Sequence, residues 1–310
     1  MNSSIPDYTT VVMSGGGIKG LGLLGALQFL ADKNKLRHVK KYIGTSIGAI
    51  VGYLLSIGYS PIEIMVVINQ HQIIEKMMNG LNMMDLIHHG GALNFFILHE
   101  FLEDMTIAKI GHVLTLQQLY DEFGKHLVCC TYNYNRQECE YMDYRSHPNL
   151  PCLTALRMTS SLPFLFHPFL YEGSIYLDGA VLDNFPVSQL TEEDVAIAIR
   201  LGQDKPTVPS MTTNPFQKKG SRRQNFDLMN YILEIIYIPI ENAHRYSTIH
   251  AKHKPVDMIN VVLDIAVFHW NISMADKFNG FSIGYETIQR YYQKPFIIPW
   301  QEPYKIPEII

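Results

Sequence analysis

The sequence predicts an α/β fold, a three-layer α/β/α sandwich with a central, mostly parallel sheet. Two units of strand, glycine-rich turn and helix follow one another at residues 8–32 and 41–57, an order typical of parallel strands joined by crossover helices. The chain has 310 residues, of which 47% are hydrophobic and 17% are charged. A chain of this length can bury a core without disulfides or metals. We expect a single domain over residues 8–300.

The composition excludes several classes of protein. The apolar content is too high for intrinsic disorder, and the aromatic content of 11% is too high for a coiled coil. The net charge of −4 and the pI of about 6.3 argue against a nucleic-acid partner. The four cysteines form no CxxC pair, so we expect reduced thiols and neither a metal nor another cofactor.

The N-terminal sequence MNSSIPDYTT has neither the basic nor the apolar region of a signal peptide. The uncharged stretch at residues 42–62 has the length of a membrane span, but it contains four glycines and Pro61. That composition instead favours a strand end, a tight turn and a buried helix. We therefore expect a cytoplasmic protein without a transmembrane segment.

The first quarter of the chain predicts alternating strands and helices, and each helix has apolar residues at helical spacing. In order, these are a strand at 8–13, a helix at 21–32, a strand at 41–43 and a helix at 46–57. A third helix is predicted from Pro61 to about Met78, with Ser60 as its N-cap.

Residues 74–112 are rich in methionine and aromatic side chains. Unbranched methionine fills irregular apolar space, and two interpretations fit such a segment: ordinary core packing, or an adaptable cap over an apolar ligand. We describe the segment as a cap-like subregion of the domain.

The remainder of the chain predicts further strands and helices around one exposed loop at residues 203–225. The expected elements are a helix at 115–123 capped by Thr115, antiparallel strands at 126–134 and 138–144, a helix at 152–161, strands at 175–177 and 195–201, a helix at 226–250, a strand at 258–263 and a helix at 282–292. The loop is rich in Pro, Ser, Thr and Asn, and its basic cluster is either solvated or in contact with anionic lipid. That cluster consists of Lys218, Lys219, Arg222 and Arg223.

A glycine-rich string, GGGIKG at residues 15–20, lies between the first strand and the first helix. Glycines there allow backbone N–H groups to point into a concavity at a helix N-terminus, which can bind a phosphate or an oxyanion. The string also fits the G-x-G-x-x-G dinucleotide fingerprint. However, the second strand ends at Gly44-Thr45-Ser46, with no acidic residue to bind a ribose.

Ser46 lies in the string GTSIG, between a predicted strand and a predicted helix. That context is typical of a nucleophile elbow, in which small neighbours let the serine hydroxyl project from a tight turn. Asp178, in the string DGA, directly follows the strand at 175–177. It is either a base that takes the serine proton or a turn aspartate bonded to its own backbone. The other elbow residues are Gly44, Thr45, Ile47 and Gly48.

Together, and in this order, GGGIKG, GTSIG and DGA resemble the signature of the patatin-like phospholipase family. The segments MTSSLPFLFHPF (158–169), DGAVLDNFPV (178–187) and GYETIQRYY (284–292) also look like segments of that family. The resemblance covers residues 10–200 well and the C-terminal third loosely. Lys19 stands where the family usually has arginine, so the charge is kept without the planar guanidinium.

The resemblance implies a patatin-like fold and a serine–aspartate dyad. Ser46 would attack an ester carbonyl, Asp178 would accept its proton, and N–H groups of the glycine loop would stabilise the oxyanion. The implied activity is that of a calcium-independent, phospholipase A-like lipid acyl hydrolase. Its substrate would be a phospholipid or another glycerolipid, reached by transient contact with a membrane surface. The implied oxyanion residues are Gly15, Gly16, Gly17, Lys19 and Gly20, with Gly16 and Gly17 foremost, and the DGA motif adds Gly179 and Ala180.

Two other functions stay open. A Ser-His-Asp triad esterase would need a histidine after the acid, although the glycine loop lacks the histidine of an HGGG loop. The available histidines are His244, His250, His253 and His269. Alternatively, the chain is a catalytically latent protein that binds lipid or waits for an activating protein partner. No segment predicts an oligomeric state.

Overall fold

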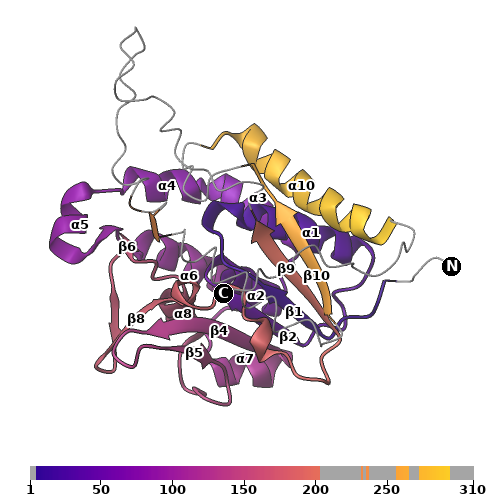
Figure 1. The fold of residues 1–310 in the computed structure, drawn as a ribbon, viewed down its shortest axis with the longest axis horizontal. Coiled ribbons are helices and arrows are strands. Elements are labelled where there is room, and N and C mark those ends of the chain that lie inside the picture. Colours follow the sequence, from indigo (N-terminus) through magenta and orange to yellow (C-terminus); the bar gives the residue numbers. More distant parts are fainter. Residues whose placement is uncertain (1–4, 203–231, 233–234, 237–255, 265–271, 294–310) are drawn as a thin grey trace, which may run out of the picture.

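The computed structural model of the protein describes residues 5–202, 232, 235–236, 256–264 and 272–293 (Figure 1). Within these residues, an eight-stranded sheet forms the centre of the fold. Its strands are β1 (Thr10–Met13), β2 (Lys41–Thr45), β4 (His126–Asn133), β5 (Glu138–Met142), β7 (Phe169–Tyr171), β8 (Ser174–Asp178), β9 (Ala196–Gly202) and β10 (Val256–Val262).

The strand order is β10-β9-β1-β2-β4-β8-β7, and β5 pairs with β4. The five strands from β10 to β4 are parallel, whereas β5, β7 and β8 join by antiparallel pairing. This confirms the predicted α/β class with a central, mostly parallel sheet, and it also confirms the antiparallel pair that β4 and β5 form.

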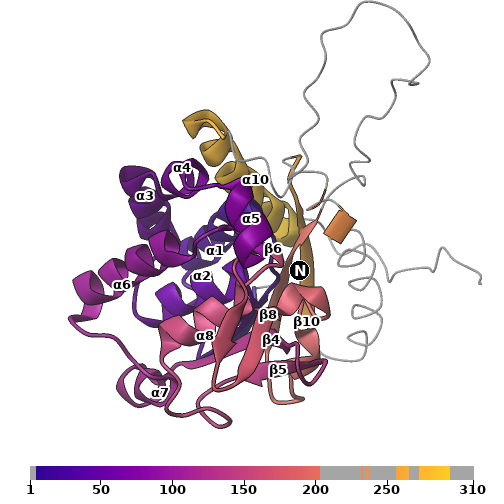
Figure 2. The same cartoon turned by 90° about the vertical axis from the view of Figure 1, so that its left-hand side faces the viewer.

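The described helices gather on one side of the sheet, as Figure 2 shows for α1, α2, α3 and α6. Their bounds are α1 (Gly20–Asp32), α2 (Ile47–Ser56), α3 (Pro61–His71), α4 (Ile73–Asn79), α5 (Met83–His89), α6 (Phe96–Ile110), α7 (Leu116–Phe123), α8 (Cys152–Thr159) and α10 (Met274–Gln293). Two short strands, β3 (Gly91–Leu93) and β6 (Phe164–Phe166), pair apart from the main sheet.

Side chains alternate between two cores, as the period of two along a strand requires. In β1, Val11 and Met13 face the main core, which α1, α2, α8 and α10 complete. Val12 faces the opposite side, where it packs with Phe185 and Val187. Within the described residues, that second face is therefore covered by the segment after β8.

Helices α1 and α10 approach each other at glycines. A Cβ at Gly25 would lie 1.8 Å from the Phe281 carbonyl oxygen, and a Cβ at Gly284 would lie 2.0 Å from the Gly22 carbonyl oxygen. Any larger side chain at these positions would separate the two backbones. Lys277 of α10 also forms an ion pair with Glu75 of α4 (2.6 Å). Helix α10 thus packs closely against α1 and forms an ion pair with α4.

Two predicted helix boundaries were wrong. The helix expected to continue to Met78 stops at His71, because Gln72 adopts a left-handed conformation (φ +49°) before α4 starts. The last helix begins at Met274 rather than at Ser282. Ser273 caps it by accepting the Asp276 N–H (3.2 Å), and its own N–H donates to the Asp276 carboxylate (3.1 Å).

Other predictions lie outside the described residues: the loop at 203–225 and nearly all of the helix at 226–250. Among the helices that the structure describes, none is by itself long and apolar enough to cross a membrane. Helices α2 and α3 pass that test only as a pair bent by 115°.

Candidate active site

Ser46 lies in the turn between β2 and α2. Its backbone has φ +54° and ψ −124°, a conformation that residues other than glycine rarely adopt. The glycines on either side permit the close approaches that this turn needs. A Cβ at Gly44 would lie 2.4 Å from a backbone nitrogen of α2, and a Cβ at Gly48 would lie 2.5 Å from the Met13 carbonyl oxygen. The turn therefore holds the serine in place by backbone contacts.

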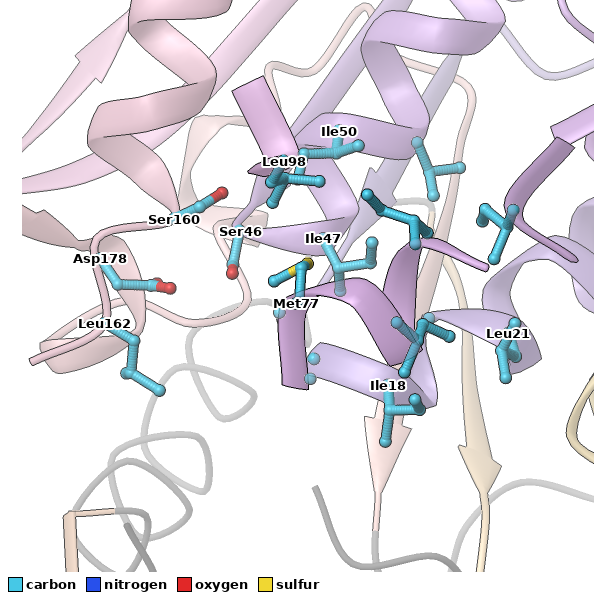
Figure 3. Close-up of a pocket in the computed structure, with 18 of the residues that line it drawn as sticks. Ile18, Leu21, Ser46, Ile47, Ile50, Met77, Leu98, Ser160, Leu162 and Asp178 are labelled. Atoms are coloured by element: carbon cyan, nitrogen blue, oxygen red, sulfur yellow. The ribbon is translucent and has the colours of Figure 1, made fainter. Parts of the chain in front are cut away.

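The sheet brings Asp178 to Ser46. Strand β2 runs parallel to β4 as far as the pair Thr45–Cys130. Strand β8 runs antiparallel to β4 and ends at the pair Asp178–Thr131. Because β5 occupies the other edge of β4 at both positions, β2 and β8 lie on the same edge and their carboxyl ends meet. Figure 3 shows the two side chains directed toward one another.

Asp178 is buried, with 2% of its surface exposed. Its Oδ1 accepts the Ala180 N–H (2.8 Å), and its own N–H donates to the Ser161 carbonyl oxygen (2.9 Å). Burial raises the pKa of Asp178 to about 7, although hydrogen bonds from Ala180 N–H and the Ser46 side chain oppose that rise. A carboxyl group with a pKa near 7 can accept and return a proton near neutral pH.

The DGA turn depends on its glycine. A Cβ at Gly179 would lie 2.4 Å from the Cys130 carbonyl oxygen. The turn is also linked to the turn that holds Ser46, because Asp183 N–H donates to the Gly179 carbonyl oxygen (2.8 Å) and the Thr45 hydroxyl donates to the Asp183 carbonyl oxygen (2.9 Å). The two turns are therefore parts of one hydrogen-bonded unit.

The glycine loop offers two backbone donors to the pocket. Gly16 and Gly17 both line it, and within the described residues neither N–H donates to a protein acceptor. Gly17 has φ +54°, a conformation that glycine adopts without steric cost. Gly20, the first residue of α1, lies so close to Ile47 that a Cβ there would be 2.3 Å from the Ile47 side chain.

Two residues of the predicted oxyanion loop have their N–H or Nζ group bonded to another protein oxygen. Gly15 N–H is engaged, because it donates to the Asn184 carbonyl oxygen (3.1 Å). Lys19 is 0% exposed and lies outside the pocket lining, and its Nζ donates to the Gly202 carbonyl oxygen (3.4 Å). Its positive charge therefore lies at the end of β9 rather than at the pocket.

A pocket of about 170 Å³ extends from Ser46 and Asp178 between α1, α2, α3, α4 and α6. In the part of the chain that the structure describes, its polar side chains are Ser46, Ser160, Asp178 and Asn184. The rest of the lining is apolar or glycine, and Leu21, Ile50, Met77 and Leu98 are among the apolar residues labelled in Figure 3.

Residues 74–112 contribute both to the core and to this pocket. Met105 of α6 is buried in the main core, whereas Met77 of α4 and Leu98 of α6 are half-buried and line the pocket. Phe101 belongs to both sets. The segment therefore contributes side chains both to the core and to the pocket lining, and its role as a cap stays a prediction.

Several residues near Ser46 and Asp178 were not predicted as site residues. Thr159 accepts the Ser46 N–H, Ser160 lines the pocket, and Asn184 contacts the glycine loop. All three lie in the strings MTSSLPFLFHPF and DGAVLDNFPV, which indicated the family but no individual role. The four histidines proposed for a triad lie outside the described residues, and no histidine occurs in the described part of the pocket lining.

Comparison with known proteins decides the family. The profile of the patatin-like phospholipase family matches residues 11–191, which contain the glycine loop, Ser46 and Asp178. The chain belongs to the patatin-like phospholipase family. The match ends before β9, so β9, β10 and α10 lie beyond the part of this patatin-like chain that the profile describes.

Two viral proteins are similar in sequence. "Probable lipid hydrolase 463L" of Invertebrate iridescent virus 6 is 31% identical over 182 residues, which are 58% of this chain and 62% of that relative. "Uncharacterized protein R571" of Acanthamoeba polyphaga mimivirus is 25% identical over 293 residues, or 90% of this chain and 92% of that protein.

Two solved structures share the fold. VipD from Legionella pneumophila has a TM-score of 0.52 at 15% identity, covering 93% of this chain and 67% of its own. ExoU, in its heterodimeric complex with SpcU from the type III secretion system of Pseudomonas aeruginosa, has a TM-score of 0.53 at 16% identity, covering 93% of this chain and 52% of its own. At these identities the likeness shows the patatin-like fold alone.

Proposed function

We propose that this protein is a lipid acyl hydrolase, phospholipase A-like, that cleaves carboxylic ester bonds of phospholipids or other glycerolipids. The observation that carries the proposal is an apolar pocket that ends at a serine paired with a buried aspartate. Membership of the patatin-like phospholipase family supports it, and so does the similarity to a viral protein named a probable lipid hydrolase.

In the acylation step, Ser46 Oγ attacks the ester carbonyl carbon while its proton passes to the Asp178 carboxylate. The negative charge that develops on the carbonyl oxygen is stabilised by Gly16 N–H and Gly17 N–H, which line the pocket and have no protein acceptor among the described residues. Collapse of the tetrahedral intermediate breaks the bond to the alcohol, which leaves with the proton from Asp178. The fatty acyl group remains esterified to Ser46.

Deacylation repeats these steps with water as the nucleophile. Asp178 takes a proton from the water as it attacks the acyl carbonyl, and returns a proton to Ser46 Oγ as the fatty acid leaves. A pKa of about 7 suits both transfers, because the carboxyl group changes protonation readily near neutral pH. The mechanism needs no calcium.

The pocket lining selects for the acyl chain. Asp178 is the one charged side chain in its described part, so the remaining wall favours hydrocarbon over a charged head group.

Large apolar side chains are also exposed on the outer side of the cap-like subregion, with Ile87 of α5 and Phe96 of α6 each more than half exposed. We propose that these side chains contact the lipid surface, which predicts weaker sedimentation of Ile87→Glu with vesicles.

Fatty-acid release from phosphatidylcholine vesicles and from emulsified diacylglycerol tests the proposal. We expect the wild type to release fatty acid with chelator present and Ser46→Ala to release none. Equal release by Ser46→Ala would contradict the assigned nucleophile, and no release by the wild type from either lipid would contradict the activity itself. Full loss of wild-type release in chelator would contradict calcium independence.

A further inference from the structure

We propose that the segment Thr159-Ser160-Ser161 is a positioning element that sets the relative placement of Ser46 and Asp178, with the Thr159 hydroxyl as its principal group. This inference rests on the proposed dyad. The segment begins with Thr159, the last residue of α8, and contacts both members of the proposed dyad through groups that are wholly buried.

Thr159 binds the backbone of Ser46, the proposed nucleophile. The Thr159 hydroxyl oxygen accepts the Ser46 N–H (3.0 Å) and donates its own hydrogen to the Cys130 carbonyl oxygen. Without that hydroxyl, a backbone N–H in a turn at positive φ would lose its partner inside the protein. Thr159 therefore stabilises the unusual conformation on which the direction of Ser46 Oγ depends.

Ser161 fixes the backbone of Asp178, the proposed base, through its own carbonyl oxygen. Its carbonyl oxygen accepts the Asp178 N–H (2.9 Å). The Ser161 hydroxyl donates to the Arg157 carbonyl oxygen (2.7 Å) and accepts a hydrogen bond from the Arg157 guanidinium (3.1 Å). That guanidinium is itself buried against the Phe95 ring, with 4.4 Å between Cζ and the ring centroid. The segment is thus anchored to the body of α8.

The two contacts complement the strand pairing. Strand β4 places the ends of β2 and β8 next to each other, but only through pairs that involve Thr45 and Asp178 rather than Ser46 itself. Thr159 connects Ser46 itself to β4, because its hydroxyl bonds both to Ser46 N–H and to a carbonyl oxygen of β4. A shift of about 1 Å in such a link is enough to cost roughly 100-fold in rate.

The test compares Thr159→Val, Thr159→Ser and the matched control Thr106→Val. Thr106 is equally buried, its hydroxyl donates to the Leu102 carbonyl oxygen (2.7 Å) and lies 3.0 Å from the Tyr53 hydroxyl, and it lies outside the pocket lining. We expect Thr159→Val to lower kcat and the rate of fluorophosphonate labelling of Ser46 about 10- to 100-fold, with KM within about twofold. Thr159→Ser, which keeps the hydroxyl, should recover most of both rates.

The control separates positioning from stability. Thr106→Val should lower the melting temperature about as much as Thr159→Val while labelling at the wild-type rate. Wild-type labelling by folded Thr159→Val, or an equal loss of labelling in Thr106→Val, would overturn the positioning role. Absence of Ser46 labelling in the wild type would instead overturn the proposed function, so the two failures are distinguishable.

A second inference rests on Ser160 alone. Its side chain lines the pocket beside the dyad and is 3% exposed, yet its Oγ makes no hydrogen bond within the described residues (Figure 3). Buried hydroxyls are almost always hydrogen-bonded. We infer that the Ser160 hydroxyl binds the ester region of the lipid, since the acyl chain offers no partner.

Ser160→Ala tests this second inference, because a structural hydroxyl and a substrate-binding hydroxyl predict different results for stability and for kcat/KM. Removing an unsatisfied buried hydroxyl leaves the melting temperature unchanged or raises it. Removing a substrate contact lowers kcat/KM for lipid esters about fivefold. Both results together support the assignment. A lower melting temperature, or an unchanged kcat/KM, would overturn it.

Discussion

The two ends of the pocket are built differently. At the proposed catalytic end, which comprises Ser46, Asp178 and the glycine loop, positions are set by the backbone: glycines without room for a Cβ, a serine at positive φ and N–H groups bonded to buried oxygens. At the apolar wall, which α3, α4 and α6 form, positions are set by large side chains such as Met77 and Leu98.

This difference predicts how each end responds to substitution. A backbone constraint either holds or fails, so a single added methyl group at the catalytic end displaces the reacting atoms. An apolar wall tolerates changes of side chain, and such changes alter which acyl chains of the substrate fit the pocket. Substitutions at the catalytic end should therefore change the chemical step, and those at the wall should change the preferred substrate.

The largest effect is expected from Asp178→Asn. Loss of the base should lower kcat about 1000-fold. Because burial raises the pKa of Asp178 to about 7, its ionised form destabilises the folded state, and this cost grows as pH rises from the pKa of the unfolded chain through 7. Melting curves should therefore show Asp178→Asn more stable than the wild type at pH 8, with the gain shrinking toward pH 4. An unchanged kcat would contradict the role of base.

A pair of Gly→Ala substitutions compares the proposed catalytic end with the end of α4, one of the helices that form the apolar wall. A Cβ at Gly48 would lie 2.5 Å from the Met13 carbonyl oxygen, whereas a Cβ at Gly80, at the end of α4, would find its nearest neighbour at 3.3 Å. We expect Gly48→Ala to lower fluorophosphonate labelling about 100-fold, and Gly80→Ala to leave it unchanged. Equal labelling of the two variants would show that the catalytic end is not set by its backbone.

The pH profile of the wild type gives the next effect in size. Asp178 must be ionised to accept the Ser46 proton, and its pKa of about 7 places that ionisation near neutrality. We expect kcat/KM on a dissolved short-chain ester to be constant well above pH 7 and to fall about tenfold per pH unit below it. An acidic limb centred near pH 4 would indicate a solvated carboxylate instead.

The smallest effect is expected at the apolar wall. Met77→Glu places a carboxylate in the pocket, which should lower turnover of long-chain esters about fivefold and leave butyrate esters nearly unchanged. Asn79→Glu is the control, because Asn79 is exposed and this substitution adds the same single charge two residues away on α4. Equal losses on long and short esters would mean that Met77 stabilises the fold rather than contacting the acyl chain of the substrate.

The same division explains what the sequence could predict. The order of β1, α1, β2 and α2 and the candidates Ser46 and Asp178 follow from local patterns, because glycine turns and apolar spacing act over a few residues. The end-to-end meeting of β2 and β8 and the contacts of Thr159 depend on pairing between distant segments, which local patterns do not encode. Gln72 gave no signal either, because a left-handed residue other than glycine has little sequence signature.

The most direct test of the central claim is the intact mass of the protein after exposure to a fluorophosphonate probe. We expect one adduct on the wild type at pH 8, none on Ser46→Ala and a much slower adduct on Asp178→Asn. That pattern would establish Ser46 as a serine activated by Asp178. An adduct on Ser46→Ala, or labelling of Asp178→Asn at the wild-type rate, would contradict the dyad.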